Sequence, residues 1–374
     1  MKKVFVVDIS GKVLNYDYSL CKELNKLVDV TLVAQLLQKS CYDGRRMRML
    51  RLVPHRLKNS EGRIKRLAKA AEGLLNYIKL MILILAKRPD TIHFQWFPFM
   101  EFCSVDNFYV SLVKLLRPSQ KIVLTVHNVY PHNMEGKEMI VYRKRFMEMK
   151  HHIDYFIVHT EASKREIEKE FGVSDSSVNV VPHGIFIPDY TPKHTFENGC
   201  HIIMYGNNSP YKGTDILLDA AQLLPQSIKE DLKISIVGQT SADYLATLKA
   251  KALGMNVNFN PAFIPDGKLY EMIDQADYIA LPYRRISQSG VLLLALYFRK
   301  PLLLSDLPSF KETMKGFTDD MFFEAGNAQA LCELIMRHLD GTIDHSDQIS
   351  IINELNNAYS WTKSAQKTLE IYEA

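Results

Sequence analysis

The chain has 374 residues, 47% of them hydrophobic and 24% charged, which excludes a disordered or collagen-like protein. Its length exceeds the usual size of one hydrophobic core and favours two domains. The net charge of +4 hides an asymmetry, because the residues through Lys150 include 27 Lys and Arg against 13 Asp and Glu, and the remainder 19 against 29. A basic first half suits nucleic acid, anionic lipid or a phosphorylated substrate.

The cysteines and the first residues indicate the compartment. The five cysteines stand far apart without a CxxC pair, so neither a zinc site nor a disulfide framework is predicted, and a reducing cytoplasm fits best. Asp8 interrupts the opening apolar run and no small-residue cleavage site follows. The run is therefore predicted to be a first buried strand and not a signal peptide.

Short apolar runs alternate with amphipathic stretches along the first half. Buried strands are predicted at residues 4–9, 28–34, 47–53, 91–94, 122–126 and 155–158, with helices at 19–27, 105–116 and 161–171. A basic stretch at 56–88 contains the apolar run 80–86, which is too short to span a bilayer. This stretch is either a packed helix with a solvated face or a helix that lies on an anionic membrane surface.

The same alternation restarts in the second half. Strands are predicted at residues 201–205, 233–237, 278–281 and 301–304. Alternating strands and helices are typical of a doubly wound parallel α/β sheet, which is predicted here twice. Residues 187–199, rich in Pro, Thr, Asn and charge, are predicted to link the two halves.

Several predicted strands end in polar residues. Ligands of open α/β sheets bind beyond the carboxyl ends of the strands, so these ends predict a shared cleft between the two domains. The four polar ends begin at His127, Pro182, Gly206 and Pro282.

Two of these ends are typical of anion sites. Lys212 and Gly213 precede a predicted helix, and Ser289 and Gly290 precede another at 291–298. Free N–H groups and the helix dipole favour a phosphate at such positions, and glycine lets the backbone approach it closely. Each pattern alone is also that of an ordinary helix start, but the two together would hold a diphosphate without a metal. The apolar face predicted for the first helix comprises Ile216, Leu217, Ala220, Leu223 and Leu224.

The remaining polar residues narrow the reaction classes. His127 is either a group that polarises or orients a substrate oxygen or a structural histidine satisfied by its own loop. The sequence contains no Walker A loop, HExxH or GxSxG motif, which weakens kinase, zinc-protease and esterase readings. The basic half lacks the aromatic interleaving of a recognised nucleic-acid-binding module, so no nucleic-acid partner is expected.

Taken together, these segments resemble the retaining glycosyltransferases of family 4, which have the GT-B fold of two Rossmann-like domains facing a cleft. The segments that carry the resemblance are HFQWFP (93–98), TVHNVYPH (125–132), VVPHGIF (180–186), YGNNSPYKGTDILLDA (205–220), IVGQ (236–239), ADYIALPYRRISQSGVLLLALYFRKPLLLSD (276–306) and PSFKE (308–312). The resemblance implies an acceptor-binding domain at 1–190, a nucleotide-sugar-binding domain at 198–357, and a final helix at 358–374 that packs back onto the first domain.

The resemblance also implies roles for individual residues. Lys212 matches the phosphate-binding lysine, and His127 matches the histidine beside the transferred sugar, so these two are the catalytic candidates. The implied donor-binding residues are Gly11, Gly206, Asn207, Lys212, Phe263, Ile264, Tyr283, Arg284, Gln288, Ser289, Gly290 and Val291. The implied acceptor-binding residues are Gln95 and Trp96. Neither a metal nor a cofactor is expected, because the nucleotide sugar is itself a substrate.

The sequence departs from the family pattern in two places. Many members carry an arginine where this chain has Asn207, and two glutamates eight residues apart where this chain reads ISQSGVLLLA, at 286–295. The ribose contact is therefore unassigned, with Tyr283, Arg284 and Gln288 as the candidates to compensate.

The expected activity is transfer of a hexosyl group, with retention, from a UDP- or GDP-sugar to a glycan or lipid-linked acceptor. Such an enzyme would serve cell-surface polysaccharide synthesis from the cytoplasm, peripherally on the inner face of the membrane. A non-catalytic GT-B-like subunit that binds a sugar nucleotide or a partner remains an alternative, favoured only by the missing glutamates. A nucleotide-sugar epimerase, which shares the two-domain architecture, is the other alternative.

Overall fold

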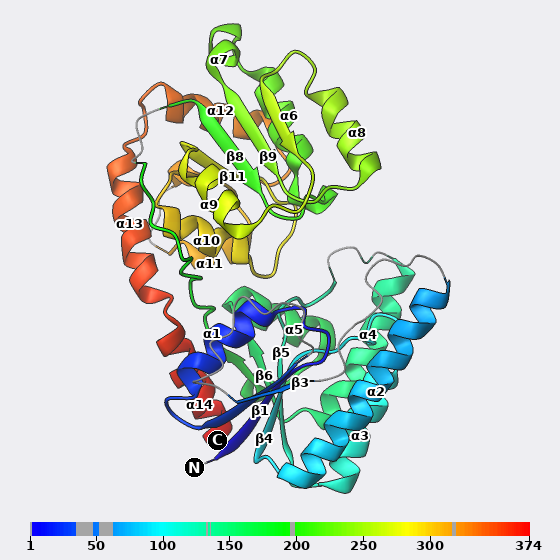
Figure 1. Cartoon of the computed structure of the whole chain (residues 1–374). Coiled ribbons are helices and arrows are strands. Elements are labelled where there is room, and N and C mark those ends of the chain that lie inside the picture. The colour runs from blue at the N-terminus through cyan, green and yellow to red at the C-terminus, as the bar shows by residue number, and fades with distance from the viewer. Residues whose placement is uncertain are drawn as a thin grey trace. The chain divides into compact units, whose positions relative to one another are not determined.

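The computed structural model describes residues 2–34, 48–51, 63–131, 134, 136–194, 199–315 and 319–374, with backbone only at 48–51, 63–70 and 319. The chain divides into two compact units (Figure 1). The first unit combines Met1–Gly184 with Ser360–Ala374, and the second is Ile185–Tyr359. The domain bounds predicted from the sequence were 1–190, 198–357 and 358–374.

The first unit is built on a parallel sheet. Among the described residues its strands run in the order β3-β2-β1-β4-β5-β6-β7. These strands are β1 (Lys3–Asp8), β2 (Asp29–Ala34), β3 (Arg48–Arg51), β4 (Thr91–Trp96), β5 (Lys121–Thr125), β6 (Tyr155–Val158) and β7 (Val178–Val180). The helices are α1 (Leu14–Leu24), α2 (Arg63–Lys87), α3 (Val105–Leu116), α4 (Lys137–Met149), α5 (Glu161–Phe171) and α14 (Trp361–Glu373), with short 3₁₀ turns at Lys150–His152 and Asp175–Ser177.

The second unit repeats this architecture on the sheet order β10-β9-β8-β11-β12-β13. The strands are β8 (His201–Tyr205), β9 (Lys233–Val237), β10 (Val257–Asn260), β11 (Tyr278–Leu281), β12 (Leu302–Ser305) and β13 (Phe322–Phe323). The helices are α6 (Thr214–Leu223), α7 (Gln226–Asp231), α8 (Ala242–Lys251), α9 (Asp266–Asp274), α10 (Gly290–Phe298), α11 (Pro308–Thr313), α12 (Ala328–Leu339) and α13 (His345–Ala358), with 3₁₀ turns at Pro210–Lys212 and Asp319–Met321.

Local sequence accounts for where the helices begin and end. Thr160 caps α5 by accepting a hydrogen bond from Ser163 N at 3.0 Å, and Gly172, with φ 56°, closes the helix in the left-handed region. Ser289 caps α10 in the same way, accepting from Leu292 N at 3.1 Å.

The predicted fold class is confirmed, since both sheets are parallel and have the doubly wound strand order. Some predicted elements were displaced. The helix expected at 19–27 runs over Leu14–Leu24, because Tyr16, Leu20 and Leu24 form its buried stripe. The predicted apolar face of α6 was wrong at Leu223, whose side chain is 52% exposed. Part of the strand predicted at 47–53 and the start of the basic stretch at 56–88 lie outside the described residues.

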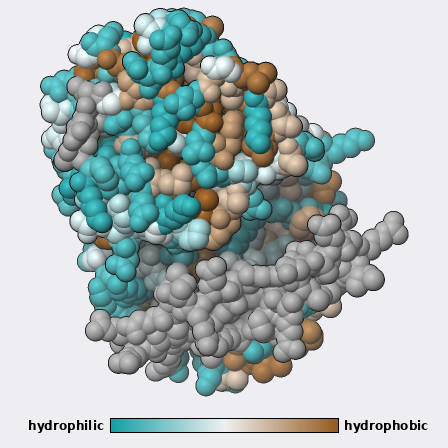
Figure 2. Space-filling model, turned by 45° about the horizontal axis from the view of Figure 1, so that its top comes forward, coloured by the Kyte–Doolittle hydropathy of each residue, from teal (hydrophilic) through white to brown (hydrophobic). Residues whose placement is uncertain are grey.

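Each unit has its own hydrophobic core on its sheet. In the first unit, α14 packs against α1, so the last residues of the chain belong with the first strand (Figure 1). On the face that Figure 2 shows, hydrophilic side chains predominate, with hydrophobic ones between them.

The strand order fixes where a ligand can enter each unit. In a doubly wound sheet the ligand crevice lies beyond the carboxyl ends of the two strands at which the order reverses. Those strands are β1 and β4 in the first unit and β8 and β11 in the second. Of the residues predicted to bind ligands, Gly11 follows β1, Gly206 follows β8 and Ser289 follows β11, whereas His127 follows β5 and Phe263 follows β10.

Candidate functional site

At the reversal point of the second unit, two glycines allow the chain segments after β8 and β9 to approach each other closely. Gly206 has φ 104° and Gly238 has φ 124°. A Cβ on Gly238 would lie 2.1 Å from the Gly206 carbonyl oxygen, and a Cβ on Gly206 would lie 2.8 Å from Lys212 Nζ. Only glycine fits at these places, and the lysine therefore lies directly against the Gly206 backbone.

Lys212 is a buried cation that has no acidic partner among the described residues. Lys212 is 5% exposed, and its Nζ lies 5.3 Å from the centre of the Tyr283 ring. No ion pair involves Lys212 among the residues the structure describes. Burial lowers the pKa of Lys212 to about 8. A buried ammonium group without a carboxylate is a ready site for an anionic ligand.

The start of α10 lies beside the same glycine. A Cβ on Gly206 would be 3.3 Å from Cγ2 of Val291, in the first turn of α10. The first N–H groups of a helix have no partner within the helix, and the helix dipole favours negative charge there. The structure thus brings together Gly206, Lys212 and the Ser289–Val291 turn, as expected for a diphosphate site.

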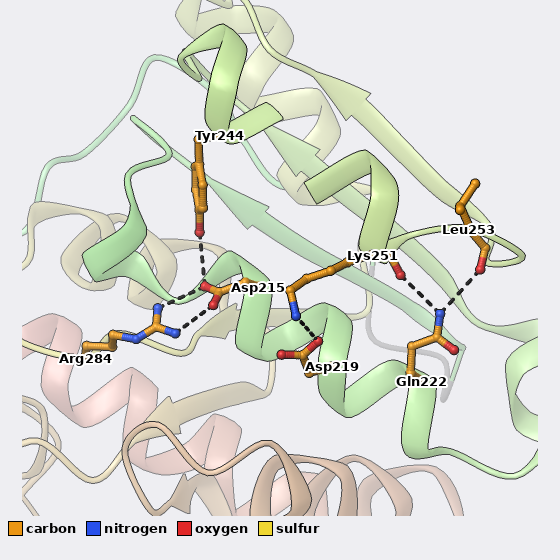
Figure 3. A network of polar contacts seen from close by, with 7 residues as sticks. All are labelled: Asp215, Asp219, Gln222, Tyr244, Lys251, Leu253 and Arg284. Carbon is orange, nitrogen blue, oxygen red and sulfur yellow. Dashed lines mark hydrogen bonds and ion pairs between the residues drawn. The ribbon is translucent and has the colours of Figure 1, made fainter. Parts of the chain in front are cut away.

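The candidates to replace the missing glutamates have different surroundings. Tyr283 is buried beneath Lys212 and packs on Phe310. Arg284 forms an ion pair with Asp215 (Figure 3), and Gln288 is half-buried in the loop before Ser289. Gln288 is therefore the candidate best placed to contact a ribose.

Three further donor candidates follow the strands β8 and β10. Asn207 is exposed directly after Gly206 and supplies no charge. Phe263 and Ile264 follow β10, and the ring of Phe263 is 74% exposed. An exposed aromatic ring at this end of the sheet is suited to stacking on a base.

In the first unit, Gly11 belongs to a loop that is held by Asp8. The Asp8 carboxylate accepts hydrogen bonds from Ser10 Oγ at 3.1 Å, Gly11 N at 2.9 Å and Val13 N at 3.0 Å. Gly11 has φ 65°, which favours glycine. Asp17 is also fully buried, and burial followed by the neighbouring Asp8 raises its pKa well above the usual range. The three hydrogen bonds to the Asp8 carboxylate thus fix the loop.

His127 belongs to a buried chain of hydrogen bonds. His159 Nδ1 lies 2.9 Å from the Val181 carbonyl oxygen, to which it must donate, and His159 Nε2 lies 3.3 Å from His127 Nδ1. Burial lowers the pKa of His159 to about 4 and that of His127 well below its usual range. Both rings are therefore neutral at pH 7, and the single N–H of His127 donates either from Nδ1 to His159 Nε2 or from Nε2 to Gln95 Oε1.

The predicted acceptor residues fall in two environments. Gln95 is fully buried, and its Oε1 lies 3.2 Å from His127 Nε2, so it supports the His127 ring. Trp96 lines a cavity of about 700 Å³ together with His127, and Lys12 Nζ lies 3.6 Å above its ring. The other residues lining this cavity are Val13, Glu101, Phe102, Asn128, Pro131, Met134, Lys137, Glu138, Val141 and Arg145.

Sequence reasoning missed three residues that support the candidate site residues: His159, Asp8 and Asp215. His159 follows β6 directly, just as His127 closely follows β5, and that placement after a strand was the available signal. Asp8 ends β1 and Asp215 lies in the first turn of α6, but carboxylates at such places are common. Only the distances single these two out.

Comparisons with known proteins agree with this architecture. Residues 15–188 match the family model described as Glycosyltransferase Family 4, and residues 188–353 match the model described as Glycosyl transferases group 1. Two curated relatives, both called GDP-mannose:glycolipid 4-beta-D-mannosyltransferase, come from Xanthomonas campestris pv. campestris. One is 26% identical over 200 residues, covering 51% of this chain and 52% of the relative, and the other 25% identical over 197 residues, with the same coverage. The chain thus spans about half the length of the curated relatives it matches.

Solved structures match the whole fold. A crystal structure of Anabaena Alr3699/HepE in complex with UDP and glucose has a TM-score of 0.70 at 16% identity and covers 100% of both chains. A glycosyltransferase from Rickettsia africae has a TM-score of 0.71 at 17% identity, covering 100% of this chain and 98% of the other. WaaG, described as a glycosyltransferase involved in lipopolysaccharide biosynthesis, has a TM-score of 0.68 at 14% identity over 99% of each chain. At these identities the likeness bears on the fold.

Proposed function

Because the chain belongs to the GT-B glycosyltransferases of group 1 and family 4, we propose that it transfers a sugar from a nucleoside-diphosphate sugar to a glycan or lipid-linked acceptor. The observation that carries the proposal is the buried Lys212, which has no ion-pair partner in the described ranges and lies beside Gly206 and the first turn of α10. The second unit would bind the donor through Gly206, Lys212 and the Ser289–Val291 turn, together called the diphosphate cradle, and the first unit would supply His127 and the acceptor cavity.

The chemistry of the step follows from where charge develops. When the bond between the sugar and the diphosphate breaks, negative charge grows on the leaving diphosphate. Fixed donors that already point at this charge lower the barrier without reorganisation, and this is usually the largest single contribution to catalysis. Lys212 and the free N–H groups at the start of α10 are such donors. They supply the positive charge that a metal would otherwise supply, so we propose transfer without a bound metal.

His127 would act as a neutral hydrogen-bonding group. Its ring is held by His159 at Nδ1 and by Gln95 at Nε2, and burial keeps it uncharged. A neutral imidazole can orient a hydroxyl group of the transferred sugar, or stabilise developing positive charge near the anomeric carbon, without adding charge of its own. We propose retention of the anomeric configuration. The relatives' names specify a β-linked mannosyl product. Determining the anomer of this chain's product therefore tests the proposed retention directly.

The donor we favour is a GDP-sugar, with a UDP-sugar as the alternative. The curated relatives are named for GDP-mannose, whereas a structure with the same fold holds UDP and glucose. The exposed Phe263 would stack on either base.

The acceptor we favour is amphiphilic and anionic. The cavity beside Trp96 has the apolar side chains Phe102 and Val141 and the cations Lys12 and Arg145 on its walls. Arg145 already donates to the carbonyl oxygens of Met100 and Phe102, and Lys12 pairs with Glu101 at 3.5 Å. Of the cations that line the cavity, Lys137 is therefore the one best placed to receive an anionic group. A glycan carried on a lipid phosphate has this combination of chemistry.

We propose that the enzyme works peripherally on the cytoplasmic face of a membrane. No helix in the described part of the chain is long and apolar enough to cross a bilayer. However, one face of α2 exposes large apolar side chains: Leu74, Leu75, Ile78, Ile82 and Leu85, each 44–60% exposed. Residues 63–88 carry seven basic residues and one acidic residue. An exposed apolar stripe on a basic helix suits the surface of an anionic bilayer.

The alternative is a non-catalytic subunit that binds a sugar nucleotide, which the absent glutamate pair at 286–295 favours. Release of GDP or UDP from the sugar nucleotide separates the two. We expect turnover by the natural chain, retention of turnover in Lys249→Met, whose lysine is exposed on α8, and loss in Lys212→Met. Binding without turnover in the natural chain would favour the subunit. Recovery of an isomerised sugar nucleotide without acceptor would instead indicate an epimerase.

A further inference from the structure

Arg284 connects the segment after β11 to the turn that carries Lys212. Its backbone N donates to the Tyr211 carbonyl oxygen at 2.7 Å, and its Nη1 donates to the Pro210 carbonyl oxygen at 2.6 Å. Tyr211 immediately precedes Lys212 in the chain. The turn is therefore held by one residue from both its backbone and its side chain.

The same guanidinium group also binds Asp215, which follows the turn in the chain. Nη1 and Nη2 donate to the two carboxylate oxygens of Asp215 at 2.9 and 2.7 Å (Figure 3). Asp215 lies in the first turn of α6, three residues after Lys212, and also accepts a hydrogen bond from Tyr244 Oη at 3.1 Å. Two parallel hydrogen bonds fix the relative orientation of the two groups as well as their distance.

The carboxylate of Asp215 remains ionised in this arrangement. Partial burial raises its pKa, but the hydrogen bonds from Arg284 and Tyr244 outweigh burial and leave the pKa below its ordinary value. An ionised carboxylate close to Lys212 would repel a diphosphate. The Arg284 cation compensates this charge, so the turn keeps the net positive charge of Lys212.

The backbone around Lys212 needs this support. Gly213 has φ 68°, and a Cβ there would lie 1.8 Å from the Pro282 carbonyl oxygen. The turn is thus pressed against the end of β11 on that side, while Lys212 itself has no ion-pair partner in the described part of the chain to hold its ammonium group. The position of Nζ therefore depends on the position of the backbone.

We propose that Arg284 is a positioning residue: with Asp215, it holds the 210–213 turn so that Lys212 meets the diphosphate, and it does not itself bind the donor. The inference depends on the proposed donor site. It differs from the sequence prediction, in which Arg284 contacts the donor, because the guanidinium group is already engaged by three acceptors.

The test compares Arg284→Gln, Asp215→Asn and the double variant by calorimetric titration with GDP and UDP. If Arg284 positions Lys212, each single change weakens binding by about 10- to 100-fold, the range expected when a binding group is misplaced by about 1 Å. The double variant should then be no weaker than the singles, since all three lose the same contact. Arg284→Lys should fail to restore binding, because an ammonium group cannot form the paired bonds.

The opposite result is equally definite. If Arg284 binds the donor directly, Asp215→Asn frees the guanidinium group, and binding should stay unchanged or strengthen. A matched control is Asp219→Asn, which removes the neighbouring ion pair of α6, with Lys251 Nζ at 2.5 Å (Figure 3), without touching the turn. This variant should bind GDP and UDP as the natural chain does.

Two further measurements separate positioning from a general loss of structure and from failure of the donor site. Binding of guanosine or uridine, which lack phosphate, should be unchanged in Arg284→Gln, whereas a disordered unit would lose it too. If Lys212→Met also leaves GDP and UDP binding intact, the proposed donor site is wrong. If Lys212→Met abolishes binding while Arg284→Gln and Asp215→Asn do not weaken it, only the positioning role is overturned.

Discussion

Replacing Lys212 with methionine should make the free protein more stable while destroying the proposed donor site. Methionine keeps most of the length of the lysine side chain but carries no charge. Burial lowers the pKa of Lys212 from 10.5 to about 8. Because each unit of pKa corresponds to 1.36 kcal/mol between the two protonation states, holding this cation in the free protein costs roughly 3 kcal/mol.

The pH dependence gives the sign of the effect. The folded pKa lies below the unfolded one, so the cost of the charged lysine is fully present below about pH 8. It is lost as the pH rises from about 8 through 10.5, because the lysine then also loses its proton in the unfolded chain. Between these values the natural protein should gain up to about 3 kcal/mol of stability that Lys212→Met does not gain. At pH 7 the variant should be the more stable of the two by a similar amount.

Urea unfolding at pH 7 and at pH 10 measures this difference. Circular dichroism follows both units, whereas tryptophan fluorescence reports only the first unit, since Trp96 and Trp361 both belong to it. The gain should appear in the circular dichroism transition alone. Lys249→Met, at an exposed position on α8, should leave both transitions unchanged. A variant at Lys212 that is less stable at pH 7, or that keeps the rise in stability with pH, would refute the reasoning.

Four other outcomes are expected. Gly213→Ala should destabilise the second unit by more than about 3 kcal/mol, because it forces a Cβ against the Pro282 carbonyl oxygen at positive φ. Gly267→Ala places its Cβ in open space and should cost little, so equal losses of unfolding free energy in the two variants would contradict the close approach. Replacing Ile78 and Ile82 by glutamate should abolish flotation with anionic vesicles but leave neutral, short-chain acceptors usable; unchanged flotation would remove α2 from the membrane contact. His159→Gln should lower kcat more than KM, since it disturbs the tautomer of His127, and an unaltered kcat would mean that the ring contact is only structural. Proton NMR of the first-formed product should show the anomer of the donor, and an inverted product would contradict retention. Turnover should persist in EDTA, and its loss would contradict metal-free transfer.

The fold and much of the cradle could be predicted because the signals are local. Apolar runs of four to six residues followed by glycine and polar residues marked the ends of β8 and β11, and a serine before an apolar run marked the start of α10. Such patterns are set by backbone chemistry within a few residues. Lys212, Gly206 and Val291 therefore lie together as expected.

The rest could not be predicted because it depends on partners far apart in the sequence. Arg284 is separated from Asp215 by 69 residues, and His159 from His127 by 32. An arginine after a strand is equally suited to a ligand or to a carboxylate of its own chain, and only the three-dimensional arrangement decides. The first turn of α1 was missed for a related reason, since the rings that surround Tyr16, those of His127, His183 and Trp361, come from distant parts of the sequence.

The most direct measurement is a crystal structure of the protein grown with GDP or UDP. We predict that the diphosphate lies within hydrogen-bonding distance of Lys212 Nζ and of the N–H groups at Gly290 and Val291, with Arg284 still paired to Asp215. A nucleotide bound in the first unit, or one whose phosphates point away from Lys212, would contradict the account.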